Sequence, residues 1–455
     1  MLQLLNHIQQ NVSAIKSSPT SYGRVSSVVG LLIEATGLQA SLGELFLIHV
    51  SETTKVEAEV VGVRGQITHL MPLDRTEGMK TGVLVEPYRQ PLTIPVGESM
   101  LGRVVDANAQ PIDGKGPLGE AEPFPVHNDP PGPMERENID STMRTGVRAI
   151  DAFVTTGKGQ RMGIFAGSGV GKSVLMGMIA KQSGADVNVI ALIGERGREV
   201  REFVEDSLGP EGLKRSIVVA VTSDKAAMSR IKGAYVATAI AEYFRDRGND
   251  VMLMMDSVTR VAMAQREIGL ASGEPPTTKG YTPSVFALLP RLLERAGRTQ
   301  SGSITGLYTI LVDNDDMNEP IADAVRSIID GHIVLSRDLA HKNHYPAIDV
   351  LESVSRVMPK IVTNEQRKLA QSGREILATY REAEDLVNIG AYVKGSNPAI
   401  DKALGKIDQL NNFLQQDMYQ HDFDAQLWRR LADVVGSEVR QQQQQQQTQA
   451  GVGGR

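Results

Sequence analysis

Cysteine is absent from the sequence, and aromatic residues make up only 4% of it. Without cysteine the chain can form neither disulfide bonds nor thiolate metal centres, which fits a protein of a reducing cytoplasm. Basic residues are also in the minority, because 48 Lys and Arg face 54 Asp and Glu and leave a net charge of -6. This balance argues against a nucleic-acid or membrane surface that covers the whole protein.

Long apolar runs are missing as well. No stretch approaches the roughly 18 apolar residues that a membrane-spanning helix needs. The first residues, MLQLLNHIQQNVSAIK, lack the basic start of a secretory signal. With 455 residues, of which 41% are hydrophobic, the chain is long enough for two or three domains with a sizeable core.

Five segments follow one another along the chain. Residues 1–22 have the apolar spacing of an amphipathic helix, which either caps its own domain or docks a partner. Residues 23–97 contain short alternating strands broken by Gly, Asp and Pro, a pattern typical of a small β-barrel. Residues 98–360 form the core, and residues 361–440 are predicted to be helical. Residues 441–455 form a Gln-rich tail that we expect to be disordered. The apolar face of the first helix comprises Leu2, Leu5, Ile8, Val12 and Ile15.

The core segment begins with a Pro-rich connection, which predicts an extended linker. From residue 145 onward, nearly continuous apolar strands alternate with helices, which indicates a parallel sheet covered on both faces. The predicted strands are RMGIFA, VNVIALIG, SIVVAVTS, VMLMMDS, SITGLYTILVD and HIVLS. The expected fold class is α/β, with a parallel-sheet core preceded by a β-barrel and followed by a helical domain.

A phosphate-binding loop is predicted between the first of these strands and the next helix. Glycines there permit the backbone angles that aim consecutive N–H groups at an anion, and the helix adds its dipole. Lys172 can reach the β- and γ-phosphates of a nucleotide, and the Ser173 hydroxyl can ligate Mg²⁺. Ala166 stands where the usual pattern begins with glycine, but it still lies in the strand, where an ordinary residue fits. The loop, GSGVGKS, consists of Gly167, Ser168, Gly169, Val170, Gly171, Lys172 and Ser173.

Two acidic residues at strand ends extend the predicted site. Asp256 ends the apolar run VMLMMD and is expected to hold Mg²⁺ through water. Glu195 follows the strand VNVIALIG, where a carboxylate can polarise an attacking water as a general base. The alternative for Glu195 is a solvated charged loop, because the surrounding segment GERGREV is rich in charge.

Several longer motifs resemble a known family. The segments are GSGVGKS, GERGREV, GEPPTTKGYTPSVFALLPRLLERAG, DDMNEPIADAVRSIIDGHIVLSR and HYPAIDVLESVSRVMPKIV. Together they are similar to the flagellar and virulence type III export ATPases, relatives of the catalytic β subunit of the rotary F-type ATPase. The resemblance runs from about Gly23 to Asp401. Within the family, DLVNIGAYVKGSNPAIDKAL is similar to the flagellar branch, and the injectisome branch is the alternative.

The resemblance implies a β-barrel, a RecA-like P-loop core and a helical C-terminal domain, which assemble as a homohexamer with ATP between subunits. Lys172 and Ser173 match the groups that bind phosphate and Mg²⁺, and Glu195 matches the catalytic carboxylate. Asp256 matches the second acidic motif, and Arg356, in SVSR, matches the arginine donated into the neighbouring site. The remaining matches are Tyr345, which stacks on adenine, and Arg196, Glu199 and Arg260, which contact the γ-phosphate or order Mg²⁺-bound water.

The implied function is hydrolysis of ATP, with Mg²⁺ as cofactor, to energise the export of flagellar subunits. The implied partners are a regulator that binds the N-terminal segment, a stalk protein, chaperone–substrate complexes and a membrane export gate. No nucleic acid is expected. Such a protein is cytoplasmic and lies peripherally at the inner-membrane base of the flagellum.

Two other functional classes fit the sequence less well. A non-catalytic ring subunit, which binds nucleotide only as structure, would lack the catalytic carboxylate that Glu195 supplies. An RNA-translocating helicase would need a basic barrel with aromatic stacking platforms. The predicted barrel strands offer little of this kind beyond Phe46, His49 and Tyr88.

Overall fold

The computed structural model describes residues 22–73, 78–88, 92–312, 316–420 and 424–436. Residues 1–21 of the expected N-terminal helix lie outside this part of the chain. The tail expected over residues 441–455 also lies outside it. Two compact units make up the structure, the first mainly from residues up to Leu92 and the second from most of the remaining chain. Within the described ranges, no helix is long and apolar enough to cross a membrane.

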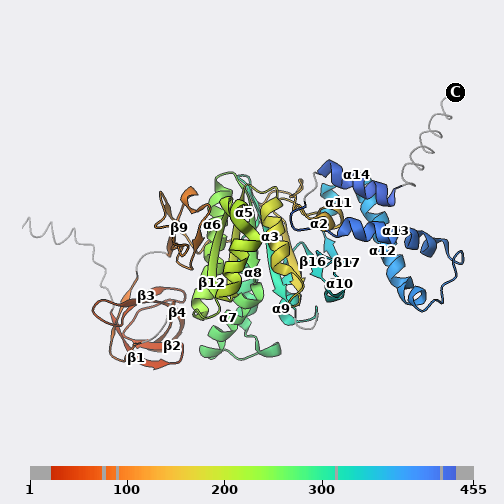
Figure 1. Ribbon diagram of the computed structural model, residues 1–455. Helices are drawn as coiled ribbons and strands as arrows, with labels where there is room; N and C mark the ends of the chain where they lie inside the picture. The colour runs from red at the N-terminus through yellow and green to blue at the C-terminus, as the bar shows by residue number, and fades with distance from the viewer. Residues whose placement is uncertain (1–21, 74–77, 89–91, 313–315, 421–423, 437–455) are drawn as a thin grey trace, which may run out of the picture. The chain divides into compact units, whose positions relative to one another are not determined.

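The first unit contains a closed barrel of antiparallel strands in the order β1-β2-β5-β4-β3-β6 (Figure 1). Successive side chains of a strand alternate between its faces, so every second residue points into the barrel. Val25, Ile33, Phe46, Ile48 and Leu70 are among these buried side chains. The strands are β1 (Gly23–Val29), β2 (Leu32–Thr36), β3 (Leu45–His49), β4 (Lys55–Arg64), β5 (Ile67–Pro72) and β6 (Leu84–Pro87).

The strand β7 (Thr93–Val96) lies beyond the closed barrel, although the sequence pattern extended the barrel to residue 97. It pairs with β9 (Glu122–Pro125) in the second unit. Ile94 and Val96 alternate along β7 and are both buried, so this short pair has an apolar face of its own. The Pro-rich connection therefore begins with a strand that is paired in a sheet.

The second unit is built on a mainly parallel sheet in the order β17-β16-β10-β15-β13-β11-β12-β8. All six strands predicted for the core are present in it, as β10 to β13, β15 and β16. The antiparallel strand β17 forms one edge. The expected fold class is thereby confirmed. The strands are β8 (Val104–Val105), β10 (Arg161–Ala166), β11 (Val187–Glu195), β12 (Ser216–Thr222), β13 (Asp250–Asp256), β14 (Gly297–Arg298), β15 (Ser303–Leu311), β16 (Gly331–Leu335) and β17 (Ile348–Ser355).

Helices connect these strands and form the C-terminal region. The core helices are α2 (Arg148–Phe153), α3 (Lys172–Gln182), α4 (Gly197–Glu202), α5 (Gly209–Lys214), α6 (Ala227–Asp246), α7 (Val258–Ala271), α8 (Pro283–Leu293), α9 (Pro320–Ile328), α10 (Arg337–His341) and α11 (Met358–Ile361). Short turns of 3₁₀ or π type are η1 (Glu98–Met100), η2 (Phe203–Leu208) and η3 (Thr278–Gly280). The C-terminal helices are α12 (Asn364–Asn388), α13 (Pro398–Leu414) and α14 (Asp424–Val435).

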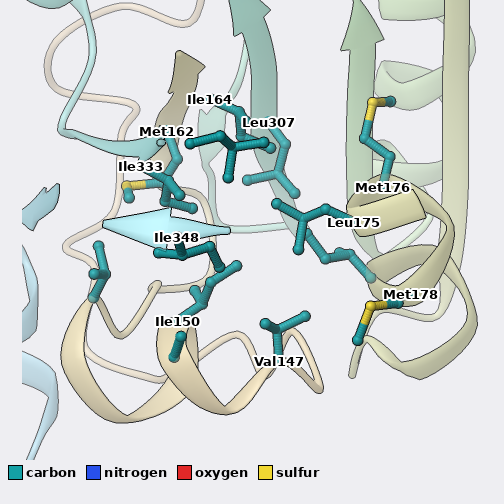
Figure 2. Close-up of a cluster of buried hydrophobic side chains, with 14 of the residues drawn as sticks. Val147, Ile150, Met162, Ile164, Leu175, Met176, Met178, Leu307, Ile333 and Ile348 are labelled. Carbon is teal, nitrogen blue, oxygen red and sulfur yellow. The ribbon is translucent and has the colours of Figure 1, made fainter. Parts of the chain in front are cut away.

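Apolar packing fixes the helix α3 against the sheet. Figure 2 shows side chains from α2, α3, β10, β15, β16 and β17 gathered in one cluster. Leu175, Met176 and Met178 of α3 are nearly or fully buried in it. Burial of each such side chain stabilises the fold by about 1.5–3 kcal/mol. The start of α3, where the predicted phosphate loop ends, is therefore rigidly placed.

The C-terminal helices are tied to the core through α2. The Arg148 guanidinium donates to Gln415 O at 2.7 Å, and Gln416 Nε2 donates to Gly146 O at 2.9 Å. A capping box of Thr363 and Gln366 begins α12. Asn397 caps α13, and its side chain accepts from the Ala399 N–H at 3.0 Å.

Candidate active site

The predicted phosphate loop joins the end of β10 to the start of α3. Gly169 and Gly171 have φ values of 80° and 90°, a region that disfavours residues with a side chain. Gly171 is also the residue that precedes the first turn of α3. Ala166 is the last residue of β10 and pairs with Leu311 and Leu335 on its two sides, so no glycine is needed there. Loop and helix thus have the form of an anion site.

Lys172 meets two carboxylates that come from other strands. Its Nζ lies 2.5 Å from Asp256 Oδ1 and 3.9 Å from Glu195 Oε1. Asp256 ends β13 and is buried, and its Oδ1 also accepts from Thr309 Oγ1 at 2.8 Å. The strands β11 and β13 are neighbours, with Leu192 opposite Asp256, which brings the two acidic residues to the same edge. We call this end of the sheet, where the carboxyl-terminal ends of β10, β11 and β13 lie, the phosphate edge.

Glu195 at the phosphate edge has a raised pKa. Burial and the nearby Asp256 charge raise its pKa to about 7, and the Lys172 charge opposes this increase. A hydrogen bond with Glu199 raises the pKa of Glu195 further and lowers that of Glu199. A carboxyl group whose pKa lies near the working pH is well suited to take a proton from water. The environment therefore favours the predicted base over a solvated loop.

Gly194 sets the direction of Glu195. A bulge interrupts the pairing of β11 with β12 between Ile193 and Glu195, and Gly194 there has a φ of 75°. A Cβ on Gly194 would lie 2.9 Å from Arg260 Cβ, so Arg260 packs directly against this turn. By contrast, Arg196 is exposed and pairs with Glu199 at 3.0 Å. Gly194 was not predicted, because nothing in the segment GERG distinguishes it from Gly197.

A cavity of about 310 Å³ opens at the phosphate edge. Oxygen-bearing side chains dominate its polar lining, and such hard ligands suit Mg²⁺. Among the described residues, no group of three or more His, Asp or Glu side chains could hold a metal by itself. The lining comprises Ser173, Glu195, Glu199, Glu202, Asp206, Ser207, Asp256, Val174, Leu192, Val200 and Phe203.

Tyr345 lies beside the phosphate loop although it is far from it in sequence. A Cβ on Gly171 would lie 3.5 Å from the Tyr345 ring, which is 41% exposed. The Tyr345 carbonyl accepts from the Gln416 N–H at 2.9 Å, which links it to the C-terminal region. An exposed ring in this place can stack on a flat base whose phosphates reach the loop.

Arg356 does not join this group. It follows β17, which is antiparallel, and its N–H donates to Asp330 O at 3.0 Å, just before β16. It thus lies level with Arg161 at the start of β10, five positions before Ala166. Five residues of strand span about 17 Å. The structure therefore places Lys172, Ser173, Glu195, Asp256 and Tyr345 together at the phosphate edge. Arg356 is exposed at the opposite end of the sheet, where β10 begins, and we call this end the back edge.

Family models match three segments of the chain and leave residues 90–145 unmatched. The ATP synthase alpha/beta family matches with its beta-barrel domain over residues 25–89 and its nucleotide-binding domain over residues 146–355. The T3SS EscN ATPase C-terminal domain matches residues 362–433. These boundaries follow the change from barrel to sheet to helices.

Two curated relatives and one solved structure illustrate the similarity. The flagellum-specific ATP synthase of Bacillus subtilis is 58% identical over 92% of this chain and 96% of that protein. The type 3 secretion system ATPase of Xanthomonas euvesicatoria is 52% identical over 87% of this chain and 90% of that protein. The assembled ATPase EscN of enteropathogenic E. coli, solved in complex with its central stalk EscO, gives a TM-score of 0.84 at 44% identity. It covers 91% of this chain and 100% of that chain.

Proposed function

This chain belongs to the ATP synthase alpha/beta family, in the branch of flagellum-specific and type III secretion ATPases, and is itself an ATPase; from this premise we propose that it drives protein export through a flagellar type III apparatus. The observation that carries the assignment of its active site is the convergence of Lys172, Asp256 and Glu195 at the phosphate edge. The flagellar branch is favoured over the injectisome branch by the higher identity to the Bacillus protein.

The residues of the phosphate edge divide the chemistry between them. The backbone N–H groups of the loop and the Lys172 ammonium hold the β- and γ-phosphates of ATP. Glu195 orients the attacking water and takes its proton, for which a pKa of about 7 is suited. Tyr345 stacks on the adenine, and Glu199 and Arg260 fix the position of Glu195 and the charge around it. Ser173 and Asp256 would hold Mg²⁺, which supplies charge neutralisation at the phosphates when bound.

Arg356 supplies the remaining positive charge to a neighbouring copy of the chain. Its exposure at the back edge and its distance from its own phosphate loop support a site shared between subunits. A ring of six copies, each giving Arg356 to the next, would complete every site. The homohexamer is thus part of the proposal, and the assembled state of EscN supports it.

The C-terminal region offers a contact surface for a stalk. Leu386 lies near the end of α12, and Ile389 and Val393 lie in the turn that joins α12 to α13; the three side chains are 47%, 75% and 69% exposed. Figure 1 shows this turn between the two helices. Tyr392 Oη donates to Asp401 Oδ1 at 3.0 Å, which ties the turn to the first turn of α13. We call Leu386, Ile389 and Val393 the apolar tip. We propose that it contacts the central stalk, and the stalk complex of EscN supports this partner.

The other partners complete the proposal. Residues 1–22 bind a regulator, and the ring receives chaperone–substrate complexes and delivers cargo to a membrane export gate. The protein then works from the cytoplasm at the inner membrane, as a peripheral component.

A complementation experiment tests the flagellar assignment. The gene is expressed in two strains of one host, one lacking its flagellar export ATPase and one lacking its injectisome ATPase. We expect recovery of swimming motility and no recovery of effector secretion, with catalytically inactive Glu195→Gln as the control in both strains. Recovery of effector secretion alone would transfer the protein to the injectisome branch.

A further inference from the structure

Asp330 at the back edge contacts both the phosphate-loop strand and Arg356. Its carboxylate accepts from Arg161 Nε at 3.0 Å, Arg161 Nη2 at 3.2 Å and the Arg161 N–H at 3.1 Å. Its carbonyl accepts from the Arg356 N–H at 3.0 Å. One residue therefore joins the first position of β10 to the backbone of the proposed donated arginine.

Further hydrogen bonds fix the same short stretch of backbone. Gln160 Nε2 donates to Asp330 O and to Ser355 Oγ, both at 3.1 Å. Ser355 Oγ in turn donates to Thr155 O at 2.8 Å. The backbone next to Arg356 is thus connected by hydrogen bonds to the residues just before β10. We call Gln160, Arg161, Asp330 and Ser355 the back-edge cluster.

The charges of the cluster make Asp330 its central member. The side chains of Arg161 and Asp330 are only 15% and 28% exposed, so their attraction is less screened by water than that of a surface pair. Arg161 also pairs with Glu294, which binds Arg136 at 2.9 Å. Loss of the Asp330 charge therefore leaves Arg161 with one carboxylate and weakens the bidentate contact that holds Asp330 in place. The main-chain carbonyl of Asp330, which accepts from the Arg356 N–H, is then less firmly positioned.

We propose that Asp330 is a positioning residue that sets where Arg356 enters the neighbouring site. The inference rests on the proposed function, in which Arg356 is donated between subunits. A misplacement of about 1 Å at a catalytic group can cost on the order of 10²-fold in rate. Asp330→Asn keeps the size of the side chain and weakens its hold on Arg161. We expect its kcat to fall by about 10–100-fold while the KM for ATP stays within about twofold.

The test measures ATP hydrolysis by full-length variants and by their mixtures. Asp330→Asn mixed with Lys172→Ala should regain activity, because the Lys172→Ala subunit gives a well-placed Arg356 to an intact phosphate loop. Asp330→Asn mixed with Arg356→Ala should regain none. The Asp330→Asn, Arg356→Ala double variant should be no slower than Arg356→Ala alone. The matched control is Asp113→Asn, which breaks the equally bidentate Arg103–Asp113 pair at 2.8 Å and should leave kcat unchanged.

Each outcome has a distinct meaning. If Asp330→Asn keeps the parental kcat while Arg356→Ala loses it, the positioning role is wrong and the proposed function stands. The role is equally wrong if the mixture with Lys172→Ala stays inactive or if the double variant is slower than Arg356→Ala. If Arg356→Ala itself remains fully active, the shared site of the proposed function fails. Should Asp330→Asn not fold, Arg161→Lys removes the bidentate fork with the charge retained, and the same results are expected of it.

Discussion

Lys172 Nζ lies 2.5 Å from Asp256 Oδ1, although 84 positions separate the two residues in sequence. The contact forms because β10 and β13 flank β15 in parallel, so the loop after one strand meets the end of the other. Two sequence motifs are thereby joined into one charged site. Its function depends first on the lysine.

Lys172→Ala should abolish hydrolysis, since it removes the cation that neutralises the β- and γ-phosphates. We expect kcat to fall by at least about 10²–10³-fold, as for other preorganised charge-stabilising groups. The matched control is Lys181→Ala on the same helix, whose ammonium lies over the Tyr419 ring, 5.4 Å from its centroid. A phosphate-release assay compares the two. Near-parental turnover by Lys172→Ala would show that the site has been placed wrongly.

Glu195→Gln should separate binding from chemistry. The amide keeps the shape of the side chain but cannot take a proton from water, so ATP should bind with nearly unchanged affinity while hydrolysis almost stops. Equilibrium binding of a fluorescent ATP analogue and single-turnover hydrolysis measure the two properties. Loss of nucleotide binding would give Glu195 a structural role instead.

The same variant should change how stability depends on pH. The folded-state pKa of Glu195, about 7, lies above its ordinary value of 4.5. The folded protein therefore binds this proton more tightly, and the stability that the residue contributes at low pH is lost as pH rises from about 4.5 to 7. The Tm of Glu195→Gln relative to the parent should rise between pH 5 and pH 8. Glu202→Gln, which removes a half-exposed carboxylate of α4, is the control. A Tm difference that is constant across this range would contradict the raised pKa.

Much of this site could be predicted because its residues directly follow apolar strands, where local sequence patterns are strongest. The glycines of the loop, and the acidic residues that end the apolar strands β11 and β13, follow from strand–turn–helix logic alone. Thr309 could not be recognised, because its hydroxyl meets Asp256 on a neighbouring strand far away in sequence, and Ser303 and Thr305 of the same strand look no different. The sequence could not reveal that Arg356 stands at the back edge, since that depends on β17 running antiparallel.

In the fold too, features with a local sequence pattern were predicted and features that depend on long-range pairing were missed. Continuous apolar runs revealed the buried strands β10 to β13, whereas β17 was missed as a strand. Glu352 and Val354 are exposed on β17, so an edge strand of this kind lacks the apolar run of a buried one. The pairing of Arg161 with Asp330 spans 169 positions and has no local signature.

Gly194→Ala should lower both stability and turnover. A left-handed alanine costs about 1–2 kcal/mol, and the new methyl group would also approach Arg260 Cβ to 2.9 Å. Gly280→Ala is the control, because Gly280 has a similar φ of 77° and nothing within 4 Å of its Cβ. We expect Gly194→Ala to lose more Tm than Gly280→Ala, and it alone should lose kcat. Equal losses for both variants would mean that the turn does not set the position of Glu195.

Polar substitution of the apolar tip should uncouple the ATPase from its stalk. The triple change of Leu386, Ile389 and Val393 to Ser removes exposed apolar surface, so basal hydrolysis and Tm should stay close to parental. Binding of a purified stalk protein, measured by calorimetry, should weaken by tenfold or more. Unchanged stalk affinity would exclude the tip as the contact.

The shared active site is tested most directly by mixing two inactive variants. Arg356→Ala retains its own phosphate loop and should bind ATP, but its kcat should fall by about 10³–10⁵-fold, as for other donated arginines. Lys172→Ala retains Arg356 but cannot bind phosphate productively. Mixed rings contain interfaces where an intact Lys172 faces an intact Arg356, so the mixture should hydrolyse ATP well above the sum of its components. The specific activity of the parental protein should likewise rise with concentration. A mixture no more active than its parts, together with a concentration-independent parental activity, would contradict the account.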